Sequence, residues 1–166
     1  MSEKLLLATS NKGKILEYRS LLHNLPYEVV TPVEQGIDIE VDALGGEPGP
    51  LSARYAGEDA SDSERIAYLL SRLEGVPWEK RTGRFRCVIA IATPDGNTEL
   101  CSGECPGLIA FAPRGEHGFG YDPVFYLPEP DKTMAELPLE VKNQISHRGK
   151  AARKAYQLLL ERLKTK

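Results

Sequence analysis

The chain has 166 residues, of which 41% are hydrophobic, which suffices for one well-packed core but hardly for two independent domains. Its formal net charge of −3 leaves no basic surplus for binding nucleic acid, and no N-terminal apolar run is long enough for a signal peptide or a membrane span. We therefore expect one domain over residues 1–166 that acts on small molecules in the cytoplasm, with neither nucleic acid nor membrane as a partner.

The first part of the chain alternates between strand and helix signals. An apolar run predicts a strand over residues 4–8, and helical periodicity predicts a helix over residues 12–23. A second strand is expected over residues 27–31, a further extended stretch over residues 37–41, and a short helix over residues 51–55.

The second part carries signals for a capped helix and a hairpin. Ser61 and Glu64 form a capping box that begins a helix. Residues 85–93 and 98–111 are predicted as two long strands, joined by an Asp-Gly turn that favours antiparallel pairing. The remaining predictions are a strand over residues 124–127, a loop over 128–132, a capped turn over 133–137 and a helix over 147–163. Together these signals predict an α/β fold in which helices flank a mixed central β-sheet.

The cysteine pattern indicates reduced thiols. Cys87, Cys101 and Cys105 are odd in number and contain no Cys-x-x-Cys pair. Cys87 lies in an apolar alternating run, where it would pack as a small hydrophobic residue. A zinc site from Cys101, Cys105 and His117 would lack a compact ligand motif, so we do not expect one.

The glycine-rich segment over residues 116–125 has features of a pocket for a flat ring. Gly118 and Gly120 allow the backbone to approach a ligand closely, and Phe119 and Tyr121 offer faces on which a base can stack. The alternative is that the glycines form an ordinary turn and the aromatic side chains fill the core.

Hydrogen-bond donors follow this segment in the chain. Lys142, His147 and Arg148 can donate to ring carbonyls or phosphates, and they include every donor type that a keto-purine needs. The segment and these donors together predict a pocket that reads a purine base. Ser146, in the same group, could alternatively do no more than cap the helix that follows.

A polar loop between the first strand and the first helix is a candidate phosphate site. Backbone N–H groups at a helix start attract anions, and here Ser10, Asn11, Lys12 and Lys14 reinforce them. The spacing is not that of a Walker loop, which has more glycine before its Lys-Ser/Thr pair. An ordinary capped strand-to-helix turn is the alternative.

Taken in order, these segments resemble the inosine-triphosphatase family, whose members remove dITP and XTP from nucleotide pools. The resemblance covers most of the chain, and the order and number of the matching motifs carry it rather than any single one. The matching motifs are Ala8-Thr-Ser-Asn-Lys-Gly-Lys14 with Glu17, Val41-Asp-Ala-Leu-Gly-Gly46, Pro48-Gly49, Ser52-Ala-Arg-Tyr-Ala-Gly57, Arg84-Phe-Arg-Cys87, Gly118-Phe-Gly-Tyr-Asp-Pro123, Lys142 and Ser146-His-Arg148.

The resemblance implies two lobes around a central cleft, a homodimer, and Mg²⁺-dependent hydrolysis of ITP, dITP or XTP to monophosphate and pyrophosphate. It implies that Ser10, Asn11 and Lys14 hold phosphate. The base and phosphate pocket that it implies consists of Phe119, Gly120, Tyr121, Asp122, Lys142, His147 and Arg148. Selectivity would rest on donors that face the six-position keto oxygen, where adenine presents an amino group instead.

One stretch departs from the family pattern. Before the Val-Asp-Ala-Leu-Gly-Gly element, the family normally has a helix opening with Glu-Asn-Ala and a strand ending in Asp-Asp-Ser-Gly. These motifs supply the magnesium ligands and the Asp that activates water. This chain runs from Tyr27 through residues 37–41 directly into Asp42, so the resemblance implies an internal deletion that removes these carboxylates.

Three explanations of the missing carboxylates stay open. In the first, Asp38, Glu40 or Asp42 replaces them, because the three share one face of an extended strand and form an acidic strip of the kind that hard cations prefer. The same pattern also fits an edge strand with a solvated acidic face. In the second, the protein is a catalytically impaired relative that binds purine nucleotides, and in the third, the deletion does not occur in the natural gene.

Overall fold

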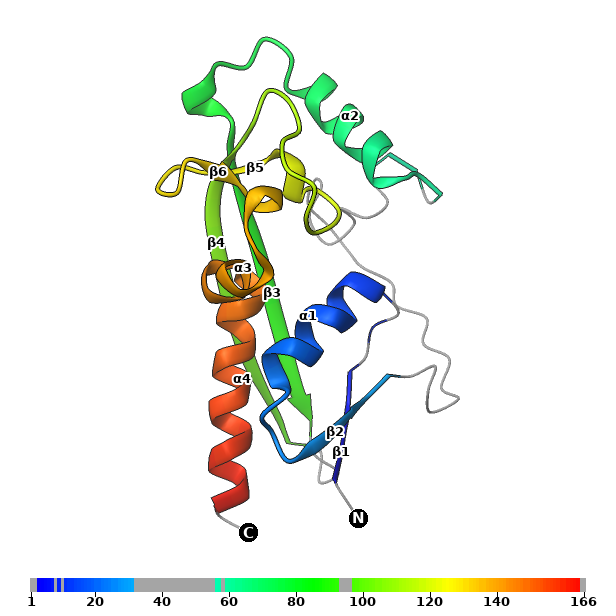
Figure 1. Cartoon of the computed structure of the whole chain (residues 1–166), viewed down its shortest axis with the longest axis vertical. Helices are drawn as coiled ribbons and strands as arrows, with labels where there is room; N and C mark the ends of the chain where they lie inside the picture. The colour runs from blue at the N-terminus through cyan, green and yellow to red at the C-terminus, as the bar shows by residue number, and fades with distance from the viewer. Residues whose placement is uncertain are drawn as a thin grey trace. The chain divides into compact units, whose positions relative to one another are not determined.

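The computed structural model describes residues 3–7, 9, 11–31, 56–57, 59–92 and 97–164 (Figure 1). The chain divides into two compact units, the first formed by Met1–Ile39, Phe85–Cys105 and Glu140–Lys166, and the second by Glu40–Arg84 and Pro106–Leu139. Two long strands, β3 (Thr82–Ala92) and β4 (Thr98–Ile109), contribute residues to both units. The single domain over residues 1–166 stays a prediction.

The first unit contains two parallel strands joined by a helix. β1 (Glu3–Leu6) pairs in parallel with β2 (Tyr27–Val30), and Leu5 lies opposite Val29. Between them, α1 (Lys12–Leu22) is capped by Asn11, whose side chain accepts a hydrogen bond from the Lys14 amide at 2.9 Å. The predicted strand, helix and strand are confirmed, with slightly different ends.

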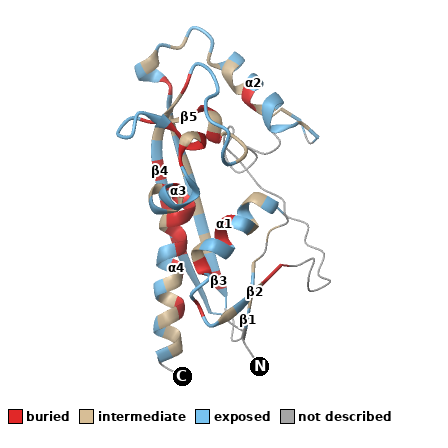
Figure 2. Ribbon diagram, viewed as in Figure 1, coloured by how far each residue is buried: buried red, intermediate tan, exposed pale blue. Residues whose placement is uncertain are grey.

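The core of the first unit joins α1 and the long strands to α4 (His147–Lys164). Figure 2 shows buried residues along α1 and the first part of α4. The small alanine side chains on α4 allow this helix to pack closely. The core consists of Tyr18, Leu22, Leu25, Ile91, Cys101, Ala152, Ala155 and Leu159.

Helix α3 (Leu139–Ile145) precedes α4 and was not predicted. Its seven residues make about two turns, too few to produce a clear helical period in the sequence. The predicted helix over residues 147–163 is confirmed as α4, and the Ser146 hydroxyl caps it by accepting a hydrogen bond from the Gly149 amide at 3.1 Å.

The second unit contains α2 (Asp62–Arg72) and short strands beside β4. The predicted capping box is present, since Ser61 N donates to Glu64 Oε2 at 2.7 Å and Glu64 N donates to Ser61 Oγ at 3.3 Å. β4 pairs antiparallel with β5 (Phe125–Leu127), which pairs antiparallel with β6 (Lys132–Thr133). The described part of this unit also contains the 3₁₀ turns η3 (Trp78–Lys80), η4 (Asp122–Val124) and η5 (Met134–Glu136).

The α/β fold is confirmed, with both parallel and antiparallel strand pairs, although in the described residues the parallel pair β1-β2 forms a sheet separate from that of β3 to β6. β3 and β4 are neighbours in a sheet of order β3-β4-β5-β6, and their connection is too short for a parallel crossover. The predicted loop over residues 128–132 is wrong at its end, because Lys132 begins the two-residue strand β6. The predicted elements over residues 37–41 and 51–55 lie outside the described residues.

Two further properties concern the described residues. No helix among them has the length and hydropathy needed to cross a membrane. Cys87, Cys101 and Cys105 form no disulfide, and Cys87 is half-buried with its sulfur 3.1 Å from the Tyr18 hydroxyl. Burial raises the pKa of the Cys101 and Cys105 thiols, which favours the protonated form.

Candidate functional site

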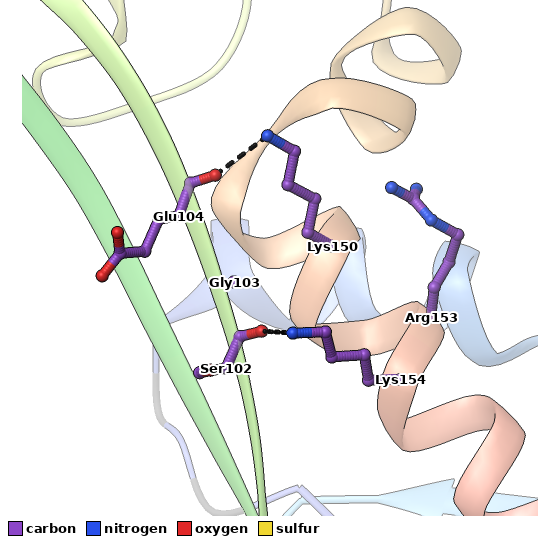
Figure 3. A pocket seen from close by; sticks show the side chains of 6 residues that line it. All are labelled: Ser102, Gly103, Glu104, Lys150, Arg153 and Lys154. Carbon is purple, nitrogen blue, oxygen red and sulfur yellow. Dashed lines mark hydrogen bonds between the residues drawn. The ribbon is translucent and has the colours of Figure 1, made fainter.

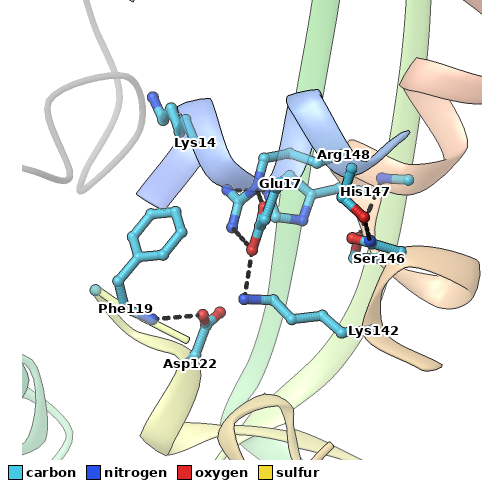
Figure 4. A network of polar contacts seen from close by, with 12 residues as sticks. Lys14, Glu17, Phe119, Asp122, Lys142, Ser146, His147 and Arg148 are labelled. Carbon is cyan, nitrogen blue, oxygen red and sulfur yellow. Dashed lines mark hydrogen bonds and ion pairs between the residues drawn. The ribbon is translucent and has the colours of Figure 1, made fainter. Parts of the chain in front are cut away.

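A buried ionic network connects α1 to α3 and α4 in the first unit (Figure 4). The Glu17 carboxylate lies 2.7 Å from Lys142 Nζ, and the two side chains are only 5% and 2% exposed. Glu17 also accepts a hydrogen bond from Arg148 Nε. One buried carboxylate thus holds two of the predicted ligand-binding cations in place.

Glu17 belongs to a matching motif, but the sequence alone predicts no role for it. The signal that could have identified it is its position three residues after Lys14, on the same face of the helix. Glu17 is buried on α1 next to Tyr18, so a carboxylate sits on the core-facing side of this helix. Buried carboxylates need a charged partner, which is what this network supplies.

His147 lies beside this network with a defined protonation state. Arg148 Nη1 is 2.9 Å from His147 Nε2, and because arginine only donates, Nε2 is the acceptor and the ring proton resides on Nδ1. Nδ1 is buried, and no hydrogen-bond partner for it exists within the described part of the chain. The ring also packs against Phe85, with centroids 4.9 Å apart. His147 therefore presents a buried, neutral N–H donor.

The surroundings of His147 oppose its protonation. Burial, followed by the positive charges of Arg148, Lys142 and Lys14, lowers the pKa of His147 from 6.5 to about 3. The imidazole is consequently neutral throughout the physiological pH range, and the tautomer set by Arg148 persists.

We expect the protein to lose stability below pH 6.5 because of His147. The unfolded chain takes up a proton near pH 6.5, whereas the folded chain resists protonation down to about pH 3. The contribution is therefore complete above pH 6.5 and falls by up to about 1.4 kcal/mol per pH unit below it. Urea unfolding at pH 7.5, 6 and 5 measures this slope. His147→Gln should show a shallower slope, and parallel curves for the two proteins would contradict the assignment.

The predicted phosphate loop is an exposed helix start. Asn11 and Lys14 are exposed, and the first turn of α1 contains no acidic residue that would offset its positive end. The Asn11 side-chain oxygen is bonded to the Lys14 amide, so the capped turn considered as an alternative is present. The capping bond leaves the Asn11 NH₂ group and the Lys14 ammonium available to an anion. Ser10 lies outside the described residues.

In the second unit, the predicted base-stacking segment forms a turn stabilised by a carboxylate. Gly118 and Gly120 have φ values of 80° and 62°, a region that favours glycine. Asp122 is 1% exposed, and its Oδ2 accepts a hydrogen bond from the Phe119 amide at 2.9 Å (Figure 4). Phe119 and Tyr121 are half-buried and do not belong to the fully buried core. Asp122, predicted as a pocket residue, thus holds the backbone of the turn.

Apart from those of the phosphate loop, the predicted residues fall into three groups. Lys142, His147 and Arg148 are brought together on the first unit, and residues 119–122 form the turn on the second unit. Asp38, Glu40 and Asp42, the candidate substitute carboxylates, lie outside the described residues. The complete binding pocket stays a prediction.

A surface pocket of about 430 Å³ lies elsewhere, between β4 and α4 (Figure 3). Lys150 and Lys154 donate to the carbonyl oxygens of Glu104 and Ser102 at 2.9 and 2.7 Å, which ties the strand to the helix. None of the predicted binding residues lines it, so its contacts are best understood as part of the packing. The lining residues are Ser102, Gly103, Glu104, Lys150, Arg153 and Lys154.

Comparison with known proteins gives consistent matches. The Ham1 family model matches residues 37–158. The dITP/XTP pyrophosphatase of Desulforamulus reducens is 46% identical over 191 aligned residues, covering 94% of this chain and 95% of the relative. The dITP/XTP pyrophosphatase of Geobacter sulfurreducens is 43% identical and covers 89% of this chain and 92% of its own length.

Solved structures agree with the sequence comparisons. A HAM1 protein from Coxiella burnetii superposes with a TM-score of 0.83 at 32% identity, covering 96% of this chain and 99% of that chain. The Ham1 protein of Staphylococcus aureus superposes with a TM-score of 0.80 at 34% identity, covering 95% and 98%.

Proposed function

Because the chain belongs to the Ham1 family, we propose that it hydrolyses the non-canonical purine nucleoside triphosphates dITP, ITP and XTP. The products would be the monophosphate and pyrophosphate, and the effect would be to cleanse the nucleotide pool. The names of the relatives support the substrate class, since they are dITP/XTP pyrophosphatases. The structural observation that carries the proposal is the buried Nδ1–H donor of His147.

This donor suits a keto-purine. A buried N–H without a partner is costly, and a six-position keto oxygen would satisfy it. Adenine would instead direct an amino donor at this N–H, leaving both donors unpaired. Because the pKa of His147 is about 3, the ring does not change its charge near neutral pH, and the preference for a keto group would persist.

The other binding roles are proposed for the residues at positions that match the family motifs. We propose that Asn11 and Lys14 at the start of α1 contact the phosphates, together with Ser10. The cations Lys142 and Arg148 are held by Glu17 and would contact the base or phosphates from fixed positions. Stacking on the base is assigned to Phe119 and Tyr121, with Gly120 allowing close approach.

The described residues bear on whether a group of side chains in this chain could bind Mg²⁺. Within residues 3–7, 9, 11–31, 56–57, 59–92 and 97–164, no three His, Cys, Asp or Glu side chains gather as a metal site would require. The described residues therefore do not by themselves form a Mg²⁺ site, and we propose that one or more of Asp38, Glu40 and Asp42 supply its ligands. When bound, the ion would neutralise phosphate oxygens.

The proposed internal deletion is supported by the length of the alignments. The match to the Desulforamulus reducens relative extends over 191 residues, more than the 166 in this chain, so that relative has residues without a counterpart here. This difference supports a second candidate function, that of a purine-nucleotide-binding protein with impaired catalysis.

The two functions are distinguished by measuring pyrophosphate release from ITP, XTP and ATP, with and without Mg²⁺, alongside ITP binding by calorimetry. We expect Mg²⁺-dependent release from ITP and XTP and little from ATP. Asp38→Asn or Asp42→Asn should then reduce turnover about a hundredfold if that residue activates water. Tight ITP binding without release would identify the impaired relative, and full activity in both variants would exclude these two carboxylates as substitutes.

His147→Ala provides the corresponding test of the binding site. ITP affinity should fall about tenfold or more under either function, because the donor is removed. An unchanged affinity would show that the pocket is assigned incorrectly.

We also propose a homodimer in the cytoplasm on the basis of the family resemblance, and light scattering at assay concentrations tests the dimer.

A further inference from the structure

Asp62, the first residue of α2, is hydrogen-bonded to the turn that carries Phe119. Its Oδ2 accepts a hydrogen bond from the Gly120 amide at 2.6 Å, although 58 residues separate the two in sequence. Its Oδ1 accepts one from Arg65 Nη1 at 2.8 Å. Both carboxylate oxygens are therefore engaged, one with the turn and one with its own helix.

The hydrogen bond between Asp62 and Gly120 holds the backbone directly after Phe119. The amides of Phe119 and Gly120 are the peptide N–H groups on either side of the Phe119 α-carbon. The first donates to Asp122 and the second to Asp62, so a carboxylate anchors the backbone on each side of this aromatic residue. Gly120, at φ 62°, would otherwise be free to adopt many conformations.

The two anchors differ in kind. Asp122 is buried and lies three residues from its partner, so it belongs to the turn itself. Asp62 has an exposed side chain and comes from a different element. It is not needed to cap α2, because Ser61 and Glu64 already form the capping box. Its bond to Gly120 therefore serves the turn more than the helix.

We propose that Asp62 is a positioning residue for base recognition. By fixing the Gly120 amide, it sets the backbone conformation from which the Phe119 ring is presented to the purine. Arg65 supports it by holding the second carboxylate oxygen. This inference rests on the proposed function, in which Phe119 stacks on the base of a nucleoside triphosphate. It predicts that Asp62 contributes to binding of the base and not to binding of the phosphates.

The test compares binding of ITP with binding of inorganic tripolyphosphate, which has no base. Asp62→Ala should weaken ITP binding about tenfold, as expected for loss of a hydrogen bond to a charged group, and leave tripolyphosphate binding unchanged. Asp62→Asn keeps a carbonyl oxygen that can accept from Gly120 and should recover part of the ITP affinity. Glu64→Gln is the matched control, because it alters an acidic residue in the same helical turn without touching Gly120.

Each outcome is informative. Equal weakening of ITP and tripolyphosphate binding, or the same ITP loss in Glu64→Gln, would show that fraying of α2 is responsible and would overturn the inference. An Asp62→Ala protein that binds ITP as the wild type does would also overturn it while leaving the proposed function intact. A wild-type protein that binds tripolyphosphate but not ITP would overturn the proposed function itself.

Discussion

Replacing Glu17 with glutamine should lower the free energy of unfolding by about 3–5 kcal/mol, the range expected when one partner is removed from a buried charge network. The buried ammonium of Lys142 and guanidinium of Arg148 would lose the carboxylate that they share. ITP affinity should fall as well, because both cations would lose their fixed positions. Urea unfolding monitored by circular dichroism at pH 7.5, combined with calorimetry, measures both effects.

Two further variants make this experiment specific. Glu28→Gln removes a carboxylate from an exposed position on β2 and should change stability by less than about 0.5 kcal/mol. Lys142→Met combined with Glu17→Gln removes a buried positive charge together with the negative one and should recover part of the loss. A loss below about 1 kcal/mol in Glu17→Gln alone would show that the network contributes little to folding.

Gly103→Ala should lower the free energy of unfolding by about 3 kcal/mol, at the upper end of the range typical of overpacking a core. A β-carbon at Gly103 would lie 2.2 Å from the His147 carbonyl oxygen and 2.6 Å from the Ala151 nitrogen, both backbone atoms. The first turn of α4 would have to move away from β4. Since this turn carries His147 and Arg148, ITP binding should weaken together with stability.

Gly83→Ala is the control for this substitution. The added β-carbon would lie 3.1 Å from Ile109 Cδ1, the end of a flexible side chain that can move aside. This variant should unfold at nearly the wild-type urea concentration. If Gly103→Ala unfolds at that same concentration and binds ITP normally, β4 and α4 are not packed as tightly as the structure shows.

Local features of the fold could be predicted from sequence because their partners are close in the chain. The capping box of Ser61 and Glu64 and the helix start at Asn11 involve contacts across three residues, so the sequence pattern identified them correctly. α3 and β6 were missed because they are too short to show a period. For the proposed site, the sequence predicts which residues donate hydrogen bonds, among them His147 and Arg148, but not how they are arranged.

The arrangement of the site could not be predicted because it depends on distant partners. Glu17 and Arg148 are 131 residues apart, and no local pattern indicates that they pair. Arg148 was expected only to donate to a ligand, whereas it also determines which nitrogen of His147 carries the proton. The role of Asp62 is likewise absent from the sequence pattern, because its bond to Gly120 joins residues 58 positions apart.

The first unit is formed from distant parts of the chain, and this limits how early it can fold during synthesis. Its core combines Tyr18 and Leu22, near the N-terminus, with Ala155 and Leu159, near the C-terminus. On the ribosome, the N-terminal strands and α1 emerge long before α4 is synthesised, so their apolar side chains cannot be fully covered until translation is almost complete. Chains truncated before α4 should therefore expose this surface to chaperones and proteases.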